Sequence, residues 1–123
     1  MKAYTDLEQS KELAEILPIE SADMYWLNRH IDLTQTKHEL FVVDRSDKHI
    51  DFFNSYAVAV EKGEIIPVWS LFALLAQMPG VELVSSNDGH CRAFWNEMYS
   101  EWHTNAVDAC VELIERVRKE EEQ

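Results

Sequence analysis

The stretch PGVELVSSNDGHCRAFWN, residues 79–96, decides the fold class that the sequence predicts. Residues 81–84 and 91–95 alternate in the manner of strands, whose successive side chains point to opposite faces. Between them, Asp88-Gly89 is a favoured two-residue hairpin turn. We therefore predict a β-hairpin that pairs residues 81–86 with residues 91–96.

The segment before this hairpin predicts a helix over residues 68–78. Pro67 suits a helix start, and Pro79-Gly80 ends the helical pattern. Only Ser70 and Gln77 are polar within the segment, so the helix is apolar nearly all round. A helix of this kind is buried on more than one side, and we expect it at the centre of the core.

Two amphipathic helices are predicted near the ends of the chain. The first spans residues 6–16, with Thr5 and Glu8 as a capping box and Pro18 beyond its end. The second spans residues 105–119 and begins at Thr104 or Asn105, which are both good N-caps. Its apolar stripe consists of Ala106, Cys110, Leu113 and Val117, widened by Val107, Val111 and Ile114, and we expect residues 120–122 to fray.

The middle of the chain predicts further strands. Residues 23–28 are rich in aromatic groups and favour a strand, although Ser21 also suits a helical turn there, and residues 40–43 are a clearer strand. A strand is favoured at 50–54; residues 55–61 fit either a helix or an extended segment, followed by a turn or a helix end at Gly63.

Together these elements predict an α+β fold with the order helix, strands, helix, hairpin, helix. We expect one antiparallel sheet of three or four strands with about three helices packed on one face. The length of 123 residues and the 46% of apolar residues predict one globular domain over residues 1–123 with a core that needs no metal.

The charge balance limits the kinds of partner. The chain has 23 acidic and 11 basic residues and a net charge of −12, without a basic stripe. Nucleic-acid binding needs clustered Lys and Arg, so we expect no affinity for duplex DNA. The polar start of the chain and the lack of an apolar run of about 18 residues predict a cytoplasmic protein that does not enter a membrane.

Several segments resemble a family of small proteins found in Bacteroides-type gut bacteria and in their prophages or mobile elements. These are residues 5–11, 17–25 and 66–75, together with NAVDAC at 105–110, which is similar to that family's "NPVDAC" helix opening. The chain has Ala106 where the family has proline, and its 44–64 segment is longer. The resemblance implies a phage-associated origin but no activity, because the family carries only the description of a hypothetical phage protein.

The sequence contains no recognisable catalytic or cofactor motif. It lacks the phosphate-binding loops, the zinc-protease helix and the C-x-x-C pattern. The nearest approach to a nucleophilic site is His90-Cys91 with His103 and Asp108, but we expect Cys91 and Cys110 to be reduced and mostly buried.

We also expect two other sets of polar residues to lie at the protein surface without a functional role. Glu97 and Glu101 share a face only if residues 96–102 are helical, and the five histidines (His30, His38, His49, His90 and His103) are scattered along the chain. We predict no catalytic residue, no cofactor and no metal site.

Aromatic residues are numerous, and Tyr and Trp are common both in cores and at interfaces. We therefore predict a non-catalytic protein-binding or accessory module that binds a protein partner or self-associates, for example as a homodimer. Two alternatives remain: an acidic inhibitor that imitates nucleic acid, and a small enzyme with an unrecognised site. The candidate interface residues are Trp69, Leu71, Phe72, Leu75, Trp26 and Trp102.

Overall fold

The structure is a computed structural model that describes residues 2–32, 35–42, 58, 60–63 and 65–121. The α+β class, the antiparallel strands and the predicted order of elements are confirmed. The strands form two three-stranded sheets, not one. The elements are α1 (Leu7–Ile16), a 3₁₀ turn (Ile19–Ser21), β1 (Met24–Asp32), β2 (Gln35–Val42), β3 (Ile65–Val68), α3 (Leu71–Ala76), β4 (Glu82–Ser85), β5 (Cys91–Trp95), β6 (Met98–Tyr99) and α4 (Ala106–Glu121).

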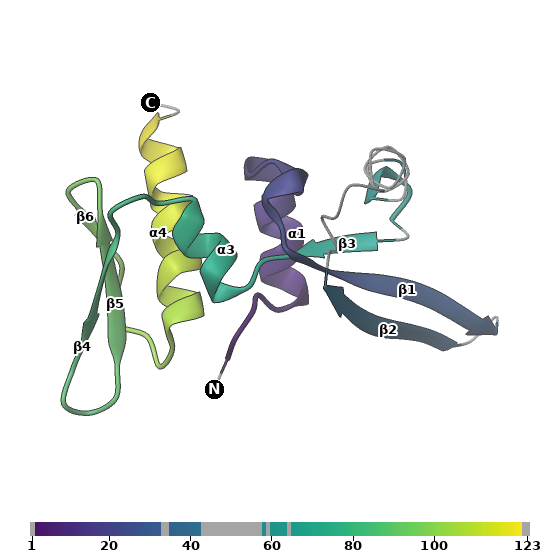
Figure 1. Ribbon diagram of the computed structural model, residues 1–123, viewed down its shortest axis with the longest axis horizontal. Helices are drawn as coiled ribbons and strands as arrows, with labels where there is room; N and C mark the ends of the chain where they lie inside the picture. Colours follow the sequence, from purple (N-terminus) through teal and green to yellow (C-terminus); the bar gives the residue numbers. More distant parts are fainter. Residues whose placement is uncertain (1, 33–34, 43–57, 59, 64, 122–123) are drawn as a thin grey trace.

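The first sheet has the strand order β2-β1-β3 and the second has the order β4-β5-β6. β1 pairs with β2 along nearly its whole length, but β3 pairs only with Met24–Leu27 of β1. The outer part of the β1–β2 hairpin therefore extends beyond the rest of the sheet (Figure 1). Both strands are longer than the predicted segments 23–28 and 40–43.

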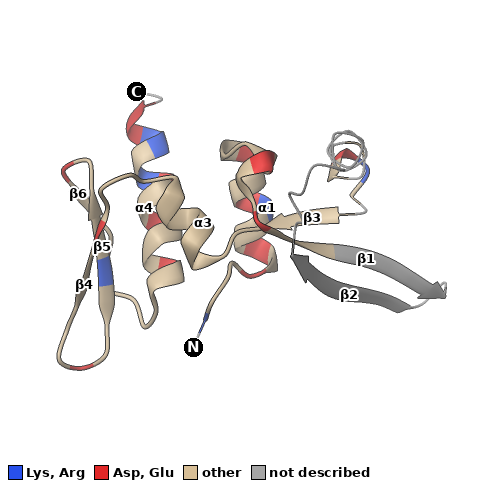
Figure 2. Cartoon of the chain, viewed as in Figure 1, with Lys and Arg blue, Asp and Glu red and all other residues tan. Residues whose placement is uncertain are grey.

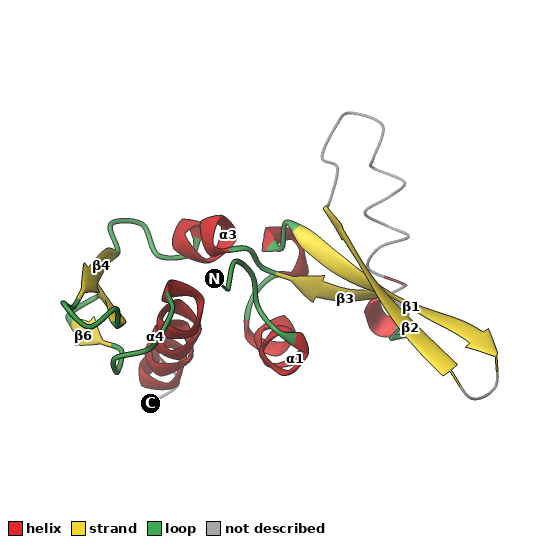
Figure 3. Ribbon diagram, turned by 90° about the horizontal axis from the view of Figure 1, so that it is seen from below, coloured by secondary structure: helices red, strands yellow, loops and turns green. Residues whose placement is uncertain are grey.

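The helices lie between the two sheets (Figures 1 and 3). α4 packs against β5 and β6, α1 contacts β3, and the two helices contact each other. α3 packs on α4. One cluster of buried side chains runs through this arrangement, including Leu13 of α1, Leu74 of α3, Ala93 of β5 and Leu113 of α4. This cluster links α1, α3 and α4 to the β4–β5–β6 sheet.

Helix α1 begins one residue later than the predicted helix, and its cap differs. Asp6 is the N-cap: its side chain accepts a hydrogen bond from the Gln9 amide, and the Gln9 side chain accepts one from the Asp6 amide. The prediction of Thr5 and Glu8 as the capping box is therefore wrong. The Thr5 hydroxyl is buried instead, where it hydrogen-bonds Ser10 and accepts from the Trp69 amide.

The predicted helix over 68–78 is wrong at its start. Residues up to Val68 belong to β3, and the helix begins only at Leu71. Ser70 is the N-cap: its side chain accepts a hydrogen bond from the Ala73 amide, while its own amide donates to Asp23. Pro67 is tolerated in β3 because β3 is an edge strand, where a missing amide donor costs little.

The hairpin of residues 81–96 is confirmed, with strands β4 and β5, but its loop differs from the prediction. The Ser86 amide donates to the His90 carbonyl and the Gly89 amide donates to the Ser86 carbonyl, which closes a three-residue loop. Gly89 has a φ of +86°, the left-handed conformation that this loop type needs at its last position. The loop is therefore Asn87-Asp88-Gly89 and not the two-residue turn.

Strand β6 was not predicted. Asn96 and Glu97 both have positive φ and form the tight turn that pairs Trp95 with Met98. Because residues 96–102 contain this turn and a strand, Glu97 and Glu101 do not share a helical face. The condition under which the sequence would place these two carboxylates side by side is therefore not met.

Helix α4 is confirmed and continues two residues beyond its predicted end, to Glu121, so Glu120 and Glu121 are helical. The Asn105 side chain accepts from the Asp108 amide, which is the bond of an N-cap. Seven apolar residues of the helix are buried: Val107, Ala109, Cys110, Val111, Leu113, Ile114 and Val117.

The strand favoured at 50–54 lies outside the described residues. Of the open segment 55–61, the described residues 58, 60 and 61 are helical. The Gly63 amide donates to the Val60 carbonyl and Gly63 has a φ of +78°, as the predicted helix end requires. No helix among the described residues has the length and hydrophobicity to cross a membrane.

Candidate interaction surface

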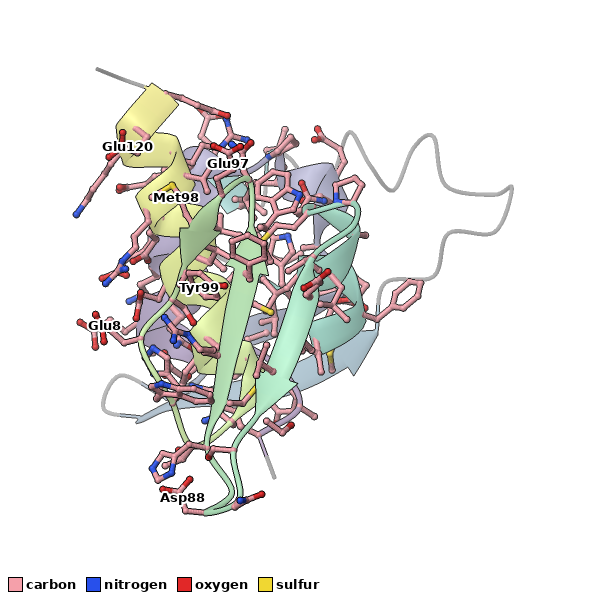
Figure 4. All side chains as sticks on the ribbon, turned by 90° about the vertical axis from the view of Figure 1, so that its left-hand side faces the viewer. Glu8, Asp88, Glu97, Met98, Tyr99 and Glu120 are labelled. Atoms are coloured by element: carbon pink, nitrogen blue, oxygen red, sulfur yellow. The ribbon has the colours of Figure 1, made fainter. Side chains whose placement is uncertain are left out.

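The outer face of the β4–β5–β6 sheet, defined here as Arg92, Phe94, Tyr99 and Trp102, is a cluster of one cationic and three aromatic side chains, of which Tyr99 and Trp102 are exposed and Arg92 and Phe94 are half-buried. Ala93 faces α4 and is fully buried, so its neighbours Arg92 and Phe94 lie on the opposite face of β5. Tyr99 of β6 is the register partner of Phe94 and shares its face. Figure 4 looks onto this face, with Tyr99 labelled and α4 behind the sheet.

The side chains of this face contact one another. The rings of Phe94 and Tyr99 are 4.4 Å apart between centroids and tilted by 32°. The Arg92 guanidinium carbon lies 4.2 Å from the Tyr99 ring centroid and 5.1 Å from that of Trp102. Both distances fall within the range of cation–π attraction. Tyr99 and Trp102 nevertheless remain 47% and 43% exposed, so the cluster is ordered but open to solvent.

Arg92 has no anionic partner among the described residues. Its Nε is buried and makes no hydrogen bond there. The other two arginines with described side chains both form ion pairs, Arg116 with Glu101 and Glu112, and Arg118 with Glu121. Although the chain has 23 acidic residues, Arg92 differs from these two arginines because no described carboxylate pairs with it.

A surface hollow of about 360 Å³ adjoins Trp102 and is lined also by Ser86, Asp88 and His90. The Asp88 carboxylate is already occupied: hydrogen bonds from Ser86 and His90 lower its pKa to about 2. Nδ1 of His90 lies 2.9 Å from Asp88 Oδ1, without the alignment of a hydrogen bond. The hollow therefore offers no free carboxylate to Arg92.

The six predicted interface residues do not form one surface in the structure. Trp69 is fully buried in the core, so its assignment to an interface is wrong. Leu71 and Leu75 are half-buried against the core. Phe72 is 80% exposed on α3 and Ala76 is also exposed, so the side of the helix that faces away from the core is apolar.

The two remaining tryptophans lie in different places. Trp26 is half-buried and packs edge-on against Tyr4, with 6.2 Å between ring centroids. Trp102 belongs to the outer face of the β4–β5–β6 sheet. Of the six predicted residues, only Trp102 contacts Arg92 within the described part of the chain. Arg92, Phe94 and Tyr99 were not among the predicted interface residues.

Among the described residues, the cysteine thiols and the His103 ring are not paired as a nucleophile and base. Cys91 and His103 meet through their backbones, while the His103 ring lies 2.8 Å from Glu112. Burial raises the pKa of Cys91, and burial together with the nearby Cys91 raises that of Cys110 to about 12. A raised pKa keeps a thiol protonated and unreactive. Both thiols are free; Cys110 is buried as expected, whereas Cys91 is only half-buried.

Asp108 has a structural role in the described residues. Burial alone would raise its pKa, but hydrogen bonds from Lys2, Gln9 and Asn105 hold the pKa below its usual value. These bonds tie the N-terminal segment and α1 to the first turn of α4. No three His, Cys, Asp or Glu side chains converge as metal ligands within the part of the chain that the structure describes.

A second site lies in the α1–α4 hollow, a surface cavity of about 350 Å³ lined by Glu12, Glu15, Ile16, Glu115, Arg118 and Lys119. Burial, and then the adjacent Glu12 carboxyl, raise the pKa of Glu115 to about 7. One oxygen of Glu115, Oε1, is buried without a hydrogen-bond donor. The Glu115 carboxyl is therefore partly protonated near neutral pH, because its ionised form is disfavoured by burial and by the adjacent carboxyl.

No sequence pattern indicates that the Glu12 and Glu115 carboxyls lie close together. Glu12 and Glu115 stand on the polar sides of two separate helices, and only the packing of α1 on α4 brings them together.

No protein-family model, curated protein or solved structure matches this chain.

Proposed function

We propose that the protein is a non-catalytic protein-binding module that uses the outer face of the β4–β5–β6 sheet. The observation that carries this proposal is the position of Arg92 between two exposed aromatic rings, without an anionic partner among the described residues. Aromatic residues and arginine are the types most enriched where protein interfaces concentrate their binding energy.

The contacts among these side chains support a role in binding, beyond the fact that some of them are exposed. Phe94 and Tyr99 already pack on each other, and Arg92 already lies against Tyr99 and Trp102. Side chains held by such contacts lose little conformational entropy when a partner covers them, which lowers the free-energy cost of association. The face is the outer side of β5, whose inner side carries the buried Ala93.

The biological setting rests on the resemblance alone. Residues 5–11, 17–25, 66–75 and 105–110 resemble phage-associated proteins, and we propose that the module serves a phage or mobile element as an accessory protein. The acidic nucleic-acid mimic stays an alternative that rests on the net charge of −12.

The small-enzyme alternative has one observation in its favour. Glu115 has a pKa of about 7 and lies in a surface hollow beside Glu12, and a carboxyl of that kind is suited to acid–base chemistry. We favour the binding module because Oε1 of Glu115 is buried, whereas Tyr99 and Trp102 of the outer face are exposed.

Selection from a phage-displayed library of random 12-residue peptides tests the proposed function. We expect the wild-type protein to select peptides whose affinity falls at least about 10-fold when Tyr99 or Trp102 is replaced by alanine. The matched control is Phe72→Ala, because Phe72 is more exposed than either residue but lies on α3. Failure to select any peptide, or peptides that bind both Ala variants of the face like wild type, would contradict the proposal.

A further inference from the structure

Resting on the proposed function, we propose that Arg92 binds a carboxylate of the partner protein. The partner presents one Asp or Glu beside an apolar side chain: the carboxylate pairs with the Arg92 guanidinium, and the apolar side chain covers the rings of Tyr99 and Trp102. The class of partner is thus a protein segment that combines a single acidic residue with an aliphatic or aromatic neighbour.

The geometry of the guanidinium supports this assignment. Arg92 lies over the Tyr99 ring at 4.2 Å and near the Trp102 ring at 5.1 Å. Stacking uses the flat face of a guanidinium and leaves its N–H donors, which point outward in its plane, for a carboxylate. Nε is shielded from water and has no partner among the described residues, so the charge of the guanidinium is incompletely compensated, and a carboxylate that binds the other nitrogens supplies the missing counter-charge.

The acidic residues near Arg92 are occupied or apart from it. Asp88 is held by Ser86 and His90, and Glu101 pairs with Arg116. Glu82 stands on β4 as the register partner of Phe94, on the same face as Arg92, but forms no ion pair with it in the structure. The described residues therefore supply no carboxylate to Arg92.

The overall charge distinguishes a protein carboxylate from nucleic acid. Asp and Glu are spread over both α1 and α4, whereas Arg92 is the only cation of β5 (Figure 2). A phosphate chain needs several cations in a row and is repelled by a net charge of −12. A single carboxylate meets the cation at short range, where repulsion from charges farther than about 8 Å is screened at physiological salt.

The test is the sequence and charge dependence of the peptides selected from the random 12-residue library. Wild-type protein is expected to select peptides that share an Asp or Glu next to an apolar residue. Their affinity is expected to fall at least about 10-fold for Arg92→Glu. Arg118→Glu makes the same change in net charge on an exposed side chain of α4 and is expected to leave the affinity within about 2-fold.

A further variant tests the one acidic residue that shares the face. Glu82→Gln is expected to leave the affinity unchanged or to raise it, since it removes a competing carboxylate; a loss of affinity would overturn the assignment. Circular dichroism of each variant shows that the fold is kept.

The outcomes separate the inference from the function on which it rests. Peptides that need Tyr99 and Trp102 but lack an acidic residue, or that bind Arg92→Glu as wild type, overturn the carboxylate assignment and leave the binding module standing. A wild-type dimer in light scattering that becomes a monomer on Arg92→Glu makes a second copy of this chain the occupant, and overturns a separate partner. A single-stranded oligonucleotide that binds the same face in place of peptides overturns both proposals.

Discussion

The guanidinium of Arg92 and the carboxyl of Glu115 are both ionisable groups on half-buried residues, but their surroundings differ. Arg92 lies on an open sheet face against aromatic rings, and no described carboxylate reaches it. Glu115 lies in the hollow between α1 and α4 and faces another carboxyl, that of Glu12.

The difference follows from what each group is able to do. An arginine stays protonated in proteins, so its charge is balanced only by an anion. A carboxyl that faces another carboxyl takes up a proton and becomes neutral. Protonation therefore neutralises the Glu115 carboxyl within the chain, whereas no described carboxylate balances the charge of Arg92.

The largest expected effect on stability concerns the α1–α4 hollow. The pKa of Glu115 is raised from 4.5 to about 7 in the folded protein, so its stabilising contribution is complete below pH 4.5 and is lost as the pH rises through 7. We expect Glu115→Gln to be more stable than wild type at pH 8.5 by about 1–2 kcal/mol, a value discounted for the partial exposure of the group. This corresponds to a rise in melting temperature of roughly 5 °C.

Thermal unfolding at pH 5 and pH 8.5 checks this expectation. Glu12→Gln, the matched variant on α1, is expected to give a gain of the same sign, because either change removes the facing pair of carboxylates. The account of the hollow is wrong if the difference between Glu115→Gln and wild type is the same at both pH values.

A smaller effect is expected at the outer face of the sheet. Arg92→Gln removes a charge that no described carboxylate balances, so the free energy of unfolding is expected to change by only about 0.5 kcal/mol and to show no added pH dependence between pH 5 and 8.5. Urea unfolding of the two proteins measures the difference. A loss of several kcal/mol would show that Arg92 stabilises the fold and is not reserved for a partner.

Local sequence signals predicted the elements that have clear ends. Helix α1 has an apolar stripe and Pro18 beyond its end, helix α4 has Asn105, and the β4–β5 hairpin has Asp88-Gly89, so each was found to within a few residues, although the N-cap of α1 was assigned to Thr5 instead of Asp6. The prediction was wrong where a helix signal and a strand signal occurred in the same segment. Pro67 reads as a helix start, yet the β-branched residues around it form the edge strand β3.

The missed features depend on contacts between distant residues. The two-residue strand β6 is too short for a pattern, and the division of the strands into two sheets is decided by packing on α1 and α4. Trp69 and Trp102 look alike in the sequence, but the backbone of Trp69 pairs with Thr5 in the core while Trp102 stays at the surface. The isolation of Arg92 is likewise visible only when the positions of the carboxylates are known.

The central claim is that Arg92 pairs with a partner carboxylate, and a charge-reversal cycle tests it most directly. Isothermal titration would compare one selected acidic peptide, and the same peptide with its Asp or Glu changed to Lys, against wild-type protein and Arg92→Glu. We predict that each single reversal weakens binding at least about 10-fold and that the double reversal restores a large part of the lost affinity. Equal weakening of both peptides by Arg92→Glu, without recovery in the double reversal, would contradict the claim.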